Sequence, residues 1–227
     1  MINLTPDECR VLGVLIEKEL TTPDQYPQTL NAVVNGASQK NNRYPVMAYD
    51  EERIFDALSS LREKGLVVRV DLAGSRVPKY RHETQQKLQI SRYELVLLAE
   101  LLLRGPQTLG ELRGRASRMH HLDSTDVVKE MLTNLMNRPE PLVRELPAVP
   151  GSRAERYVQL LCPDAHPLEA MPTSAEATAS SSGSHSLSER VEQLEAEVTV
   201  LRDAVRKLAT ALGEADPFAE PENAQQA

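Results

Sequence analysis

The chain has 227 residues, of which 41% are hydrophobic and 4% are aromatic, with no tryptophan. This length suffices for two small domains, whose cores must be built from aliphatic side chains. The formal net charge is −7, which argues against a strongly basic nucleic-acid-binding protein. No apolar run is long enough to cross a membrane and the N-terminus lacks a charged-then-apolar signal. We therefore expect a cytoplasmic protein with no membrane partner.

The negative charge is concentrated towards the C-terminus. Residues 163–227 hold 4 Lys and Arg against 12 Asp and Glu, a net charge of −8. Residues 1–85 hold 11 against 12, and residues 86–162 hold 11 against 9, so their net charges are −1 and +2. The body of the chain is therefore close to neutral, which permits nucleic-acid binding without predicting it.

The first predicted element is a helix from Pro6 to about Leu20. Thr5 and Glu8 have the spacing of a capping box, and proline suits the first helical position. The apolar face of this helix recurs at helical spacing and includes Leu12, Leu15 and Ile16. A proline-rich turn follows at residues 22–27, after which the pattern predicts a second helix.

A third helix and a two-stranded ribbon complete the first set of elements. Apolar residues at helical spacing predict a helix over 54–64, and Gly65 is typical of a helix end. Residues 66–70 predict a strand, a turn follows at 73–75, and residues 77–81 predict the returning strand. A helix followed by such a ribbon is how a winged-helix domain ends.

The same order of elements returns later in the chain. Ser91 with Glu94, and Thr108 with Glu111, repeat the capped helix starts, and a second ribbon is predicted within 142–161. Beyond residue 162 the composition changes to Pro, Ser, Thr and Ala, which cannot bury a core. The predicted fold is mainly α with small β-ribbons: winged-helix domains at 1–84 and 88–162, a disordered flexible linker at 163–186, a coiled-coil helix at 187–213 and a disordered tail at 214–227.

Three runs of residues resemble a known family. They are residues 10–19 (RVLGVLIEKE), residues 21–27 (TTPDQYP) and the QKNNR run at 39–43 followed by PVM. On these runs the chain resembles the YceH-like bacterial proteins, a family of unknown function, over about residues 1–162. The resemblance implies a tandem winged-helix fold and no established activity. The family usually has a cysteine before its Asn-Gln-Lys run where this chain has Ala37-Ser38, so any role of that thiol does not carry over.

The C-terminal heptads predict a parallel two-stranded coiled coil and hence a homodimer. Valine predominates at the a positions and leucine occupies the d positions, the combination that favours two parallel strands. Charge pairs of opposite sign flank this seam at the g and e positions. The alternative is an amphipathic helix folded back on its own chain, which would show a broader apolar stripe. The predicted dimerisation residues are Leu187, Val191, Leu194, Val198, Leu201, Val205, Leu208 and Leu212.

No pattern in the chain indicates catalysis. There is no glycine-rich phosphate loop, no His/Cys metal spacing and no nucleophile context, so we expect a non-enzyme without metal or cofactor. The adjacent His120 and His121 would point about 100° apart on a helix and could not share a metal. Cys9 and Cys162 fit no metal or redox spacing, and we expect Cys9 to be buried and inert.

Two polar stretches suit nucleic acid. Lys and Arg contact phosphates, and Asn and Gln contact base edges, so the loop at 39–44 and the Arg-rich second helix of the second domain are candidates. The alternatives are a loop that caps its neighbouring helix and a solvated charged helix face. With two residues of the first wing added, the nucleic-acid-binding candidates are Gln39, Lys40, Asn41, Arg43, Arg76, Lys79, Arg113, Arg115 and Arg118.

The third helices argue against ordinary DNA recognition. Many winged helices enter the major groove by the first turn of this helix. Here that turn is acidic, at residues 50–52 and again at 123–126. Two functions therefore stay open: a DNA-binding regulator that docks through the stretches above, and a scaffold that binds a protein partner without nucleic acid.

Overall fold

The computed structural model describes residues 2–71, 77–147, 154–162, 165–166, 199, 202 and 205–207. The chain forms two compact units, Met1–Met171 and Pro172–Ala227. In the second unit the described residues are helical, and Val205 is 40% exposed. The other predicted dimerisation residues, most of the predicted linker, the C-terminal tail, the turn at 73–75 and Arg76 lie outside the described residues.

The first half of unit 1 follows the predicted order of helices and ribbon. The first helix begins where the capping box predicted, because Thr5 Oγ1 accepts from the Glu8 amide and the Glu8 carboxylate accepts from the Thr5 amide. Two very short elements, η1 and β1, separate it from the second helix. The elements are α1 (Pro6–Thr21), η1 (Pro23–Gln25), β1 (Gln28–Thr29), α2 (Leu30–Ala37), α3 (Glu51–Glu63), β2 (Val67–Val70) and β3 (Lys79–His82).

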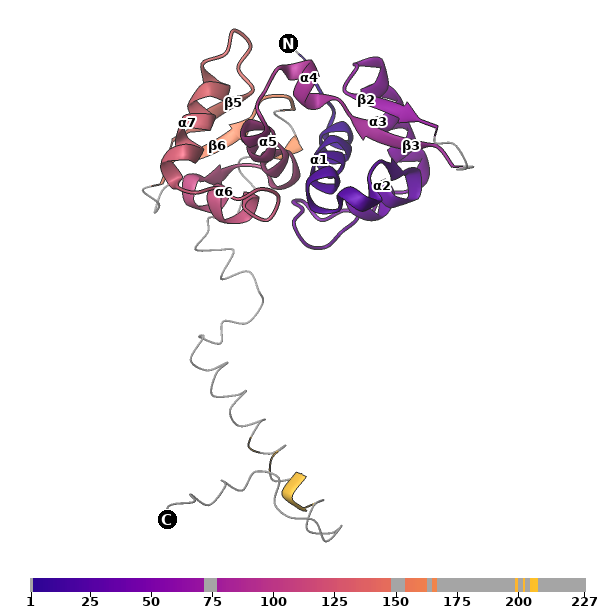
Figure 1. The fold of residues 1–227 in the computed structure, drawn as a ribbon, viewed down its shortest axis with the longest axis vertical. Coiled ribbons are helices and arrows are strands. Elements are labelled where there is room, and N and C mark those ends of the chain that lie inside the picture. Colours follow the sequence, from indigo (N-terminus) through magenta and orange to yellow (C-terminus); the bar gives the residue numbers. More distant parts are fainter. Residues whose placement is uncertain are drawn as a thin grey trace, which may run out of the picture. The chain divides into compact units, whose positions relative to one another are not determined.

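The second half repeats this order after a short connecting helix (Figure 1). Capping boxes at Ser91 and Thr108 begin its first two helices, as the sequence predicted. The connector is α4 (Thr84–Leu88), and the elements that follow are α5 (Arg92–Arg104), β4 (Gln107–Thr108), α6 (Leu109–Ala116), α7 (Thr125–Met136), β5 (Val143–Leu146) and β6 (Arg156–Gln159).

Each half contains a three-stranded antiparallel sheet. The strand orders are β1-β3-β2 and β4-β6-β5. The longer strands pair in register, with Val68 opposite Arg81 and Arg144 opposite Val158. The two-residue strands β1 and β4 were not predicted, because each is too short to show alternation and runs directly into a helix. The prediction of a mainly helical chain with small antiparallel sheets is confirmed.

The two halves pack against each other through α1 and α5, which lie side by side in the middle of unit 1 (Figure 1). Leu12 and Leu15 of α1, and Leu98 and Leu101 of α5, are fully buried in one shared core. Gly13 allows the close approach, since a Cβ atom there would lie 2.9 Å from the Leu103 side chain. A helix covered on both sides must be apolar nearly all round, and this explains the unbroken apolar runs of α1 and α5.

The packed unit continues beyond the predicted boundary at residue 162. Ala165 and His166 are buried, at 9% and 2% exposure. The His166 ring lies against Gly105, whose φ of +76° suits glycine, and a Cβ there would come within 2.6 Å of the ring. The start of the chain lies against the residues that follow β6, where the Leu4 amide donates to the Leu161 carbonyl at 2.7 Å.

Candidate nucleic-acid interface

The loop between α2 and α3 carries four of the nine predicted binding residues, and two buried arginines hold it in place. Arg43 is 5% exposed, and its guanidinium donates to both carboxylate oxygens of Glu17 at 3.1 and 2.5 Å and to the Gly36 carbonyl at 3.0 Å. Arg10 donates to the Ala37 carbonyl at 3.3 Å and to the Pro45 carbonyl at 2.6 Å. The loop therefore has a defined conformation at both ends.

The same loop is bound to the second half. The Tyr44 amide donates to the Leu103 carbonyl at 2.9 Å. Asn42, in the left-handed region with φ of 61°, accepts a hydrogen bond from Arg104 through its side-chain oxygen. Asparagine is among the few residues that tolerate this conformation. The loop thus spans the junction between the halves.

A network of buried charges lies at this junction. Glu17 of α1 and Glu100 of α5 are 2% and 0% exposed, and Arg118 joins them at 2.5 and 3.1 Å. Arg104 also pairs with Glu100, at 3.0 Å. Burial alone would raise the pKa of Glu17, but the hydrogen bonds and positive charge of Arg43 and Arg118 lower it. Three guanidiniums therefore face two carboxylates.

Further cations surround this network. The pKa of Arg104 is lowered first by burial and then by the nearby positive charges of Arg115, Arg118 and Arg43. Arg115 pairs with Glu111 at 3.1 Å. We call the whole group the seam surface; it has six cations and three anions, a net charge of +3, and consists of Lys18, Lys40, Arg43, Arg104, Arg115, Arg118, Glu17, Glu100 and Glu111.

The structure separates the predicted candidates into two groups. It places six of them on the seam surface or beside it on the α2–α3 loop: Gln39, Lys40, Asn41, Arg43, Arg115 and Arg118. Among the described residues Lys40 is exposed and has no side-chain partner. Arg113 instead donates to the Leu122 and Asp123 carbonyls at 3.3 and 2.9 Å, and Lys79 lies half-buried on β3. Arg43 is fully enclosed, so it positions the loop and does not face solvent.

Sequence reasoning missed the members of the seam that lie on the central helices. Lys18, Glu17, Glu100 and Arg104 were not singled out. Glu17 and Glu100 did carry a signal, because each interrupts an apolar helix face at a position where a lone charge would be costly to bury. Such a residue predicts a buried partner, although the partner itself cannot be identified without the fold.

The first turns of α3 and α7 are acidic in the structure as in the sequence. Asp50 caps α3 by accepting from the Arg53 amide at 2.8 Å, and Ser124 caps α7. Arg53 is held by Asp7 in a two-pronged ion pair at 2.5 and 2.7 Å. Phe55 is 49% exposed on the same helix. This surface suits a basic or apolar partner better than phosphate.

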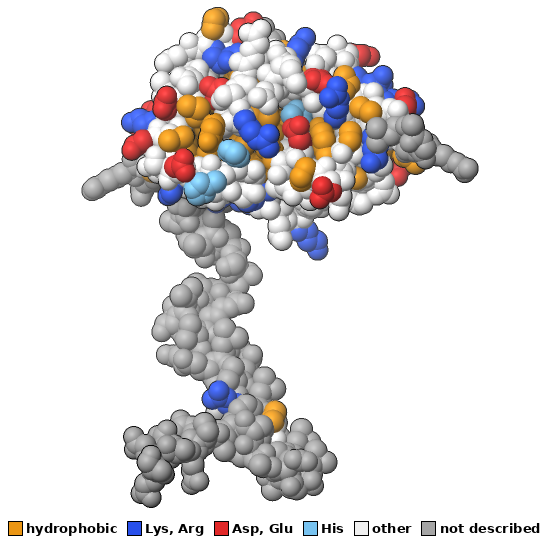
Figure 2. Space-filling model, in the orientation of Figure 1, with side chains coloured by type: hydrophobic (Ala, Val, Ile, Leu, Met, Phe, Trp, Pro, Cys, Tyr) orange, Lys and Arg blue, Asp and Glu red, His pale blue; other side chains and the backbone are white. Residues whose placement is uncertain are grey.

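One face of the molecule can be compared with the seam surface. On the face seen in Figure 2, basic, acidic and hydrophobic side chains alternate without a continuous field of one sign. A polar cavity of about 300 Å³ lies beside His82, whose ring meets Glu19 at 2.5 Å and whose amide donates to the Tyr26 hydroxyl at 2.7 Å. No three His, Cys, Asp or Glu residues cluster as metal ligands within the described ranges.

No helix in the described part of the chain is long and apolar enough to cross a membrane.

The family model described as "Protein of unknown function, DUF480" matches residues 4–152. A UPF0502 protein of Koribacter versatilis (strain Ellin345) is 46% identical over 199 residues, 87% of this chain and 90% of its own. One of Geotalea daltonii is 51% identical over 159 residues, 70% and 72% of the two chains. One of Shewanella sp. (strain MR-7) is 42% identical over 211 residues, 91% and 95%.

Proposed function

The chain belongs to the DUF480 family of unknown function, and we propose that it is a non-enzymatic tandem winged-helix protein that binds duplex DNA at the seam surface. The predicted relationship to a bacterial family of unknown function is confirmed. The winged-helix assignment is supported by the order of elements in each half: three helices, a two-stranded ribbon, and a short strand before the second helix that pairs with the ribbon.

The excess of positive charge at the seam is the observation that carries this proposal. Phosphate contacts supply most of the affinity of non-specific DNA binding. Arg104, Arg115 and Arg118 are 22%, 36% and 27% exposed, and each is already held by a carboxylate. Guanidiniums held in this way lose less side-chain entropy when they bind a phosphate. Lys40 adds an exposed charge on a loop that is fixed at both ends.

Binding at the seam surface would also keep DNA away from the acidic first turns of the third helices, α3 and α7. The carboxylates at the starts of α3 and α7 stabilise the positive end of each helix. They would repel phosphates if these helices entered a groove in the ordinary way. DNA that crossed the seam would contact the α2–α3 loop and α6 without requiring either acidic turn.

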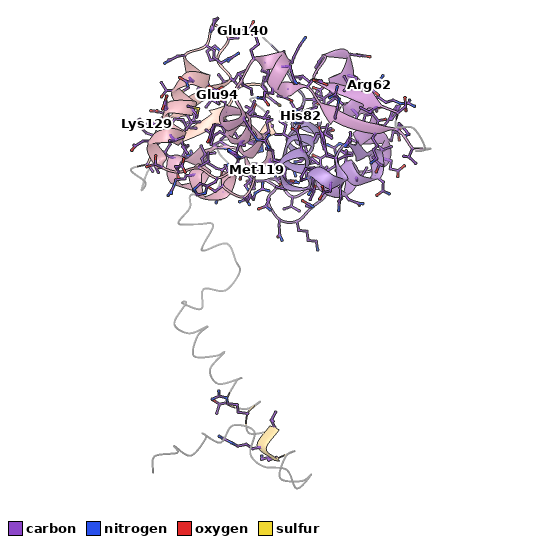
Figure 3. The ribbon with its side chains drawn as sticks, viewed as in Figure 1. Arg62, His82, Glu94, Met119, Lys129 and Glu140 are labelled. Carbon is purple, nitrogen blue, oxygen red and sulfur yellow. The ribbon has the colours of Figure 1, made fainter. Side chains whose placement is uncertain are left out.

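The test compares Lys40→Ala with two matched controls, Arg62→Ala on α3 and Lys129→Ala on α7. All three side chains are exposed cations. In Figure 3, Arg62 and Lys129 lie on opposite sides of unit 1, with Met119, the neighbour of Arg118, between them. The affinity of the full chain for duplex DNA of mixed sequence is measured across a range of salt concentrations. We expect Lys40→Ala to weaken binding and to reduce the slope of log K against log salt by about 0.9, while the controls leave it unchanged.

Other outcomes of this experiment have definite meanings. If Arg62→Ala or Lys129→Ala reduces the slope and Lys40→Ala does not, the third helices contact DNA and the seam assignment is wrong. Absence of binding by the wild-type chain at low salt would remove the DNA proposal altogether. Arg43→Ala is unsuitable as a probe, because it would remove a buried partner of Glu17 and destabilise the fold.

A second candidate function is a scaffold that binds a protein partner. The acidic first turn of α3 and the half-exposed Phe55 favour it, since together they suit a basic segment with an apolar anchor. Capture of partners from lysate, with and without nuclease, separates the two functions. Partners that remain bound after nuclease treatment, and that are lost with Phe55→Ala, would support the scaffold.

A further inference from the structure

The two cysteines of the chain, distant in sequence, face each other in the fold. Cys9 lies near the start of α1 and Cys162 follows β6, and the two thiols are close enough for each to influence the other. They are 0% and 2% exposed and belong to the same core. The expectation that Cys9 is buried is confirmed, but the spacing of the cysteines in the sequence concealed that they form a pair.

Hydrogen bonds to the backbone hold the two segments that carry the cysteines. The Cys162 amide donates to the Gln159 side-chain oxygen at 2.8 Å, and the Gln159 amide group donates back to the Cys162 carbonyl at 2.6 Å. One residue earlier, the Leu161 carbonyl accepts from the Leu4 amide at 2.7 Å. The start of α1 and the end of β6 are therefore held together independently of the sulfur atoms.

We infer that Cys9 and Cys162 are a dithiol that hydrogen peroxide oxidises to an intramolecular disulfide, locking the first helix of unit 1 to its last strand. The inference does not depend on the proposed DNA binding. A disulfide requires an S–S bond of about 2.05 Å and Cα atoms about 4.4–6.8 Å apart, and the hydrogen bond from the Leu4 amide to the Leu161 carbonyl holds the two segments side by side. The link would close nearly the whole of unit 1 into one covalent loop, and long loops give the largest entropic stabilisation.

The oxidation balances with peroxide as the only oxidant. The thiolate of one cysteine attacks a peroxide oxygen, the O–O bond breaks, and the hydroxide that leaves takes up a proton to become water, with a sulfenic acid formed. The second sulfur then attacks the sulfenic sulfur, the S–O bond breaks, and the departing hydroxide joins the second thiol proton as another water. Two thiols are oxidised to one disulfide, and one peroxide is reduced to two waters.

Burial sets the rate of this reaction. Burial raises the pKa of Cys9, and the neighbouring Cys162 thiol raises it further. Since the thiolate is the nucleophile, the pair reacts more slowly than an exposed thiol. The same burial excludes external thiols, so the disulfide, once formed, resists exchange with other chains. The pair is therefore suited to a slow and lasting response to oxidant.

The test treats the folded full chain with hydrogen peroxide and then analyses it without reductant. We expect the intact mass to fall by two hydrogen atoms, both cysteines to resist maleimide after denaturation, and the melting temperature to rise on the order of 10 °C. Dithiothreitol added after unfolding should restore both thiols. Cys9→Ala and Cys162→Ala are matched controls for each other, and each should abolish all three changes while keeping a native circular dichroism spectrum.

Several results would overturn the inference. One is that both thiols of the treated wild-type chain still react with maleimide after denaturation. Another is a mass increase from sulfinic acid in place of a disulfide. A disulfide between two chains, or one that forms only in denaturant, would equally show that the two thiols do not react as a pair in the folded protein. If a single alanine variant fails to fold, the mass and the maleimide reactivity of the wild-type chain decide the matter alone.

Discussion

At the scale of single residues, Glu17 is a carboxylate buried between two arginines. Its carboxylate is 2% exposed and binds both Arg43 and Arg118. Neither the burial of Arg43 nor the pairing of the two arginines could be predicted from the sequence, because arginine is ordinarily exposed and each partner comes from a distant segment. The sequence predicted residues of the right type at the seam but could not distinguish those that hold the loop from those that face solvent.

Glu17→Ala is therefore expected to destabilise the protein by about 3–5 kcal/mol, because it leaves a buried guanidinium without its counter-charge. The matched control is Glu63→Ala at the exposed end of α3, which should change stability by no more than about 0.5 kcal/mol. Chemical denaturation gives both free energies of unfolding. Equal values for the two variants would show that the network contributes little.

His166 makes stability depend on pH. Burial lowers its pKa to about 4, and the positive charge of Arg10 acts in the same direction. Its ordinary pKa is 6.5, so between pH 6.5 and about 4 the unfolded chain binds a proton that the folded chain does not. Stability should therefore fall as the pH falls through this window, by on the order of 3 kcal/mol in total, and be unaffected by His166 above it.

His166→Phe tests this dependence, since it keeps a ring against Gly105 and removes the titrating group. The free energy of unfolding is measured from pH 7 to pH 4 for both proteins. The variant should show a flatter profile in this range, and parallel profiles would contradict the assignment. Glu8 and Glu17 do not confound the comparison, because their lowered pKa values affect stability mainly below the ordinary carboxyl value of 4.5 and both proteins carry them.

At the scale of elements, capping residues and apolar spacing were the most reliable guides. The starts of α1, α5 and α6 were predicted from Thr5, Ser91 and Thr108, whose signals lie within one helical turn. The strands β1 and β4 were missed because each depends on a partner strand some 50 residues away in the sequence. Local signals predict where a helix begins, whereas strand pairing is a property of the fold.

The C-terminal helix remains a prediction from its heptads. Val205, at a predicted a position, is helical and 40% exposed in the single chain, and Lys207 at the c position is exposed too. Val205→Asp should therefore dissociate the predicted dimer, because it places like charges opposite each other at the apolar interface of the predicted coiled coil. Lys207→Asp is the control and should leave the dimer intact. Sedimentation at several concentrations checks both, and a wild-type chain that stays monomeric at high concentration would refute the coiled coil.

At the scale of the whole molecule, unit 1 is a duplication whose two copies share one core. The sequence predicted two tandem winged-helix domains and left open whether they pack rigidly on each other. It did not predict that α1 and α5 would pack together, or that the seam charges and the two cysteines would meet across the junction. These contacts depend on the relative orientation of the copies, for which neither copy carries a local signal.

The hydrogen bond between the Leu4 amide and the Leu161 carbonyl has a consequence for synthesis on the ribosome. The first helix emerges early, yet the strand that completes its surroundings is among the last parts of unit 1 to be made. At ordinary translation rates the interval is on the order of 10 s. For about the first half of that time, until α5 has been made, the side of α1 that will pack on α5 has no partner, so the nascent chain must shield an apolar helix until its own second half arrives.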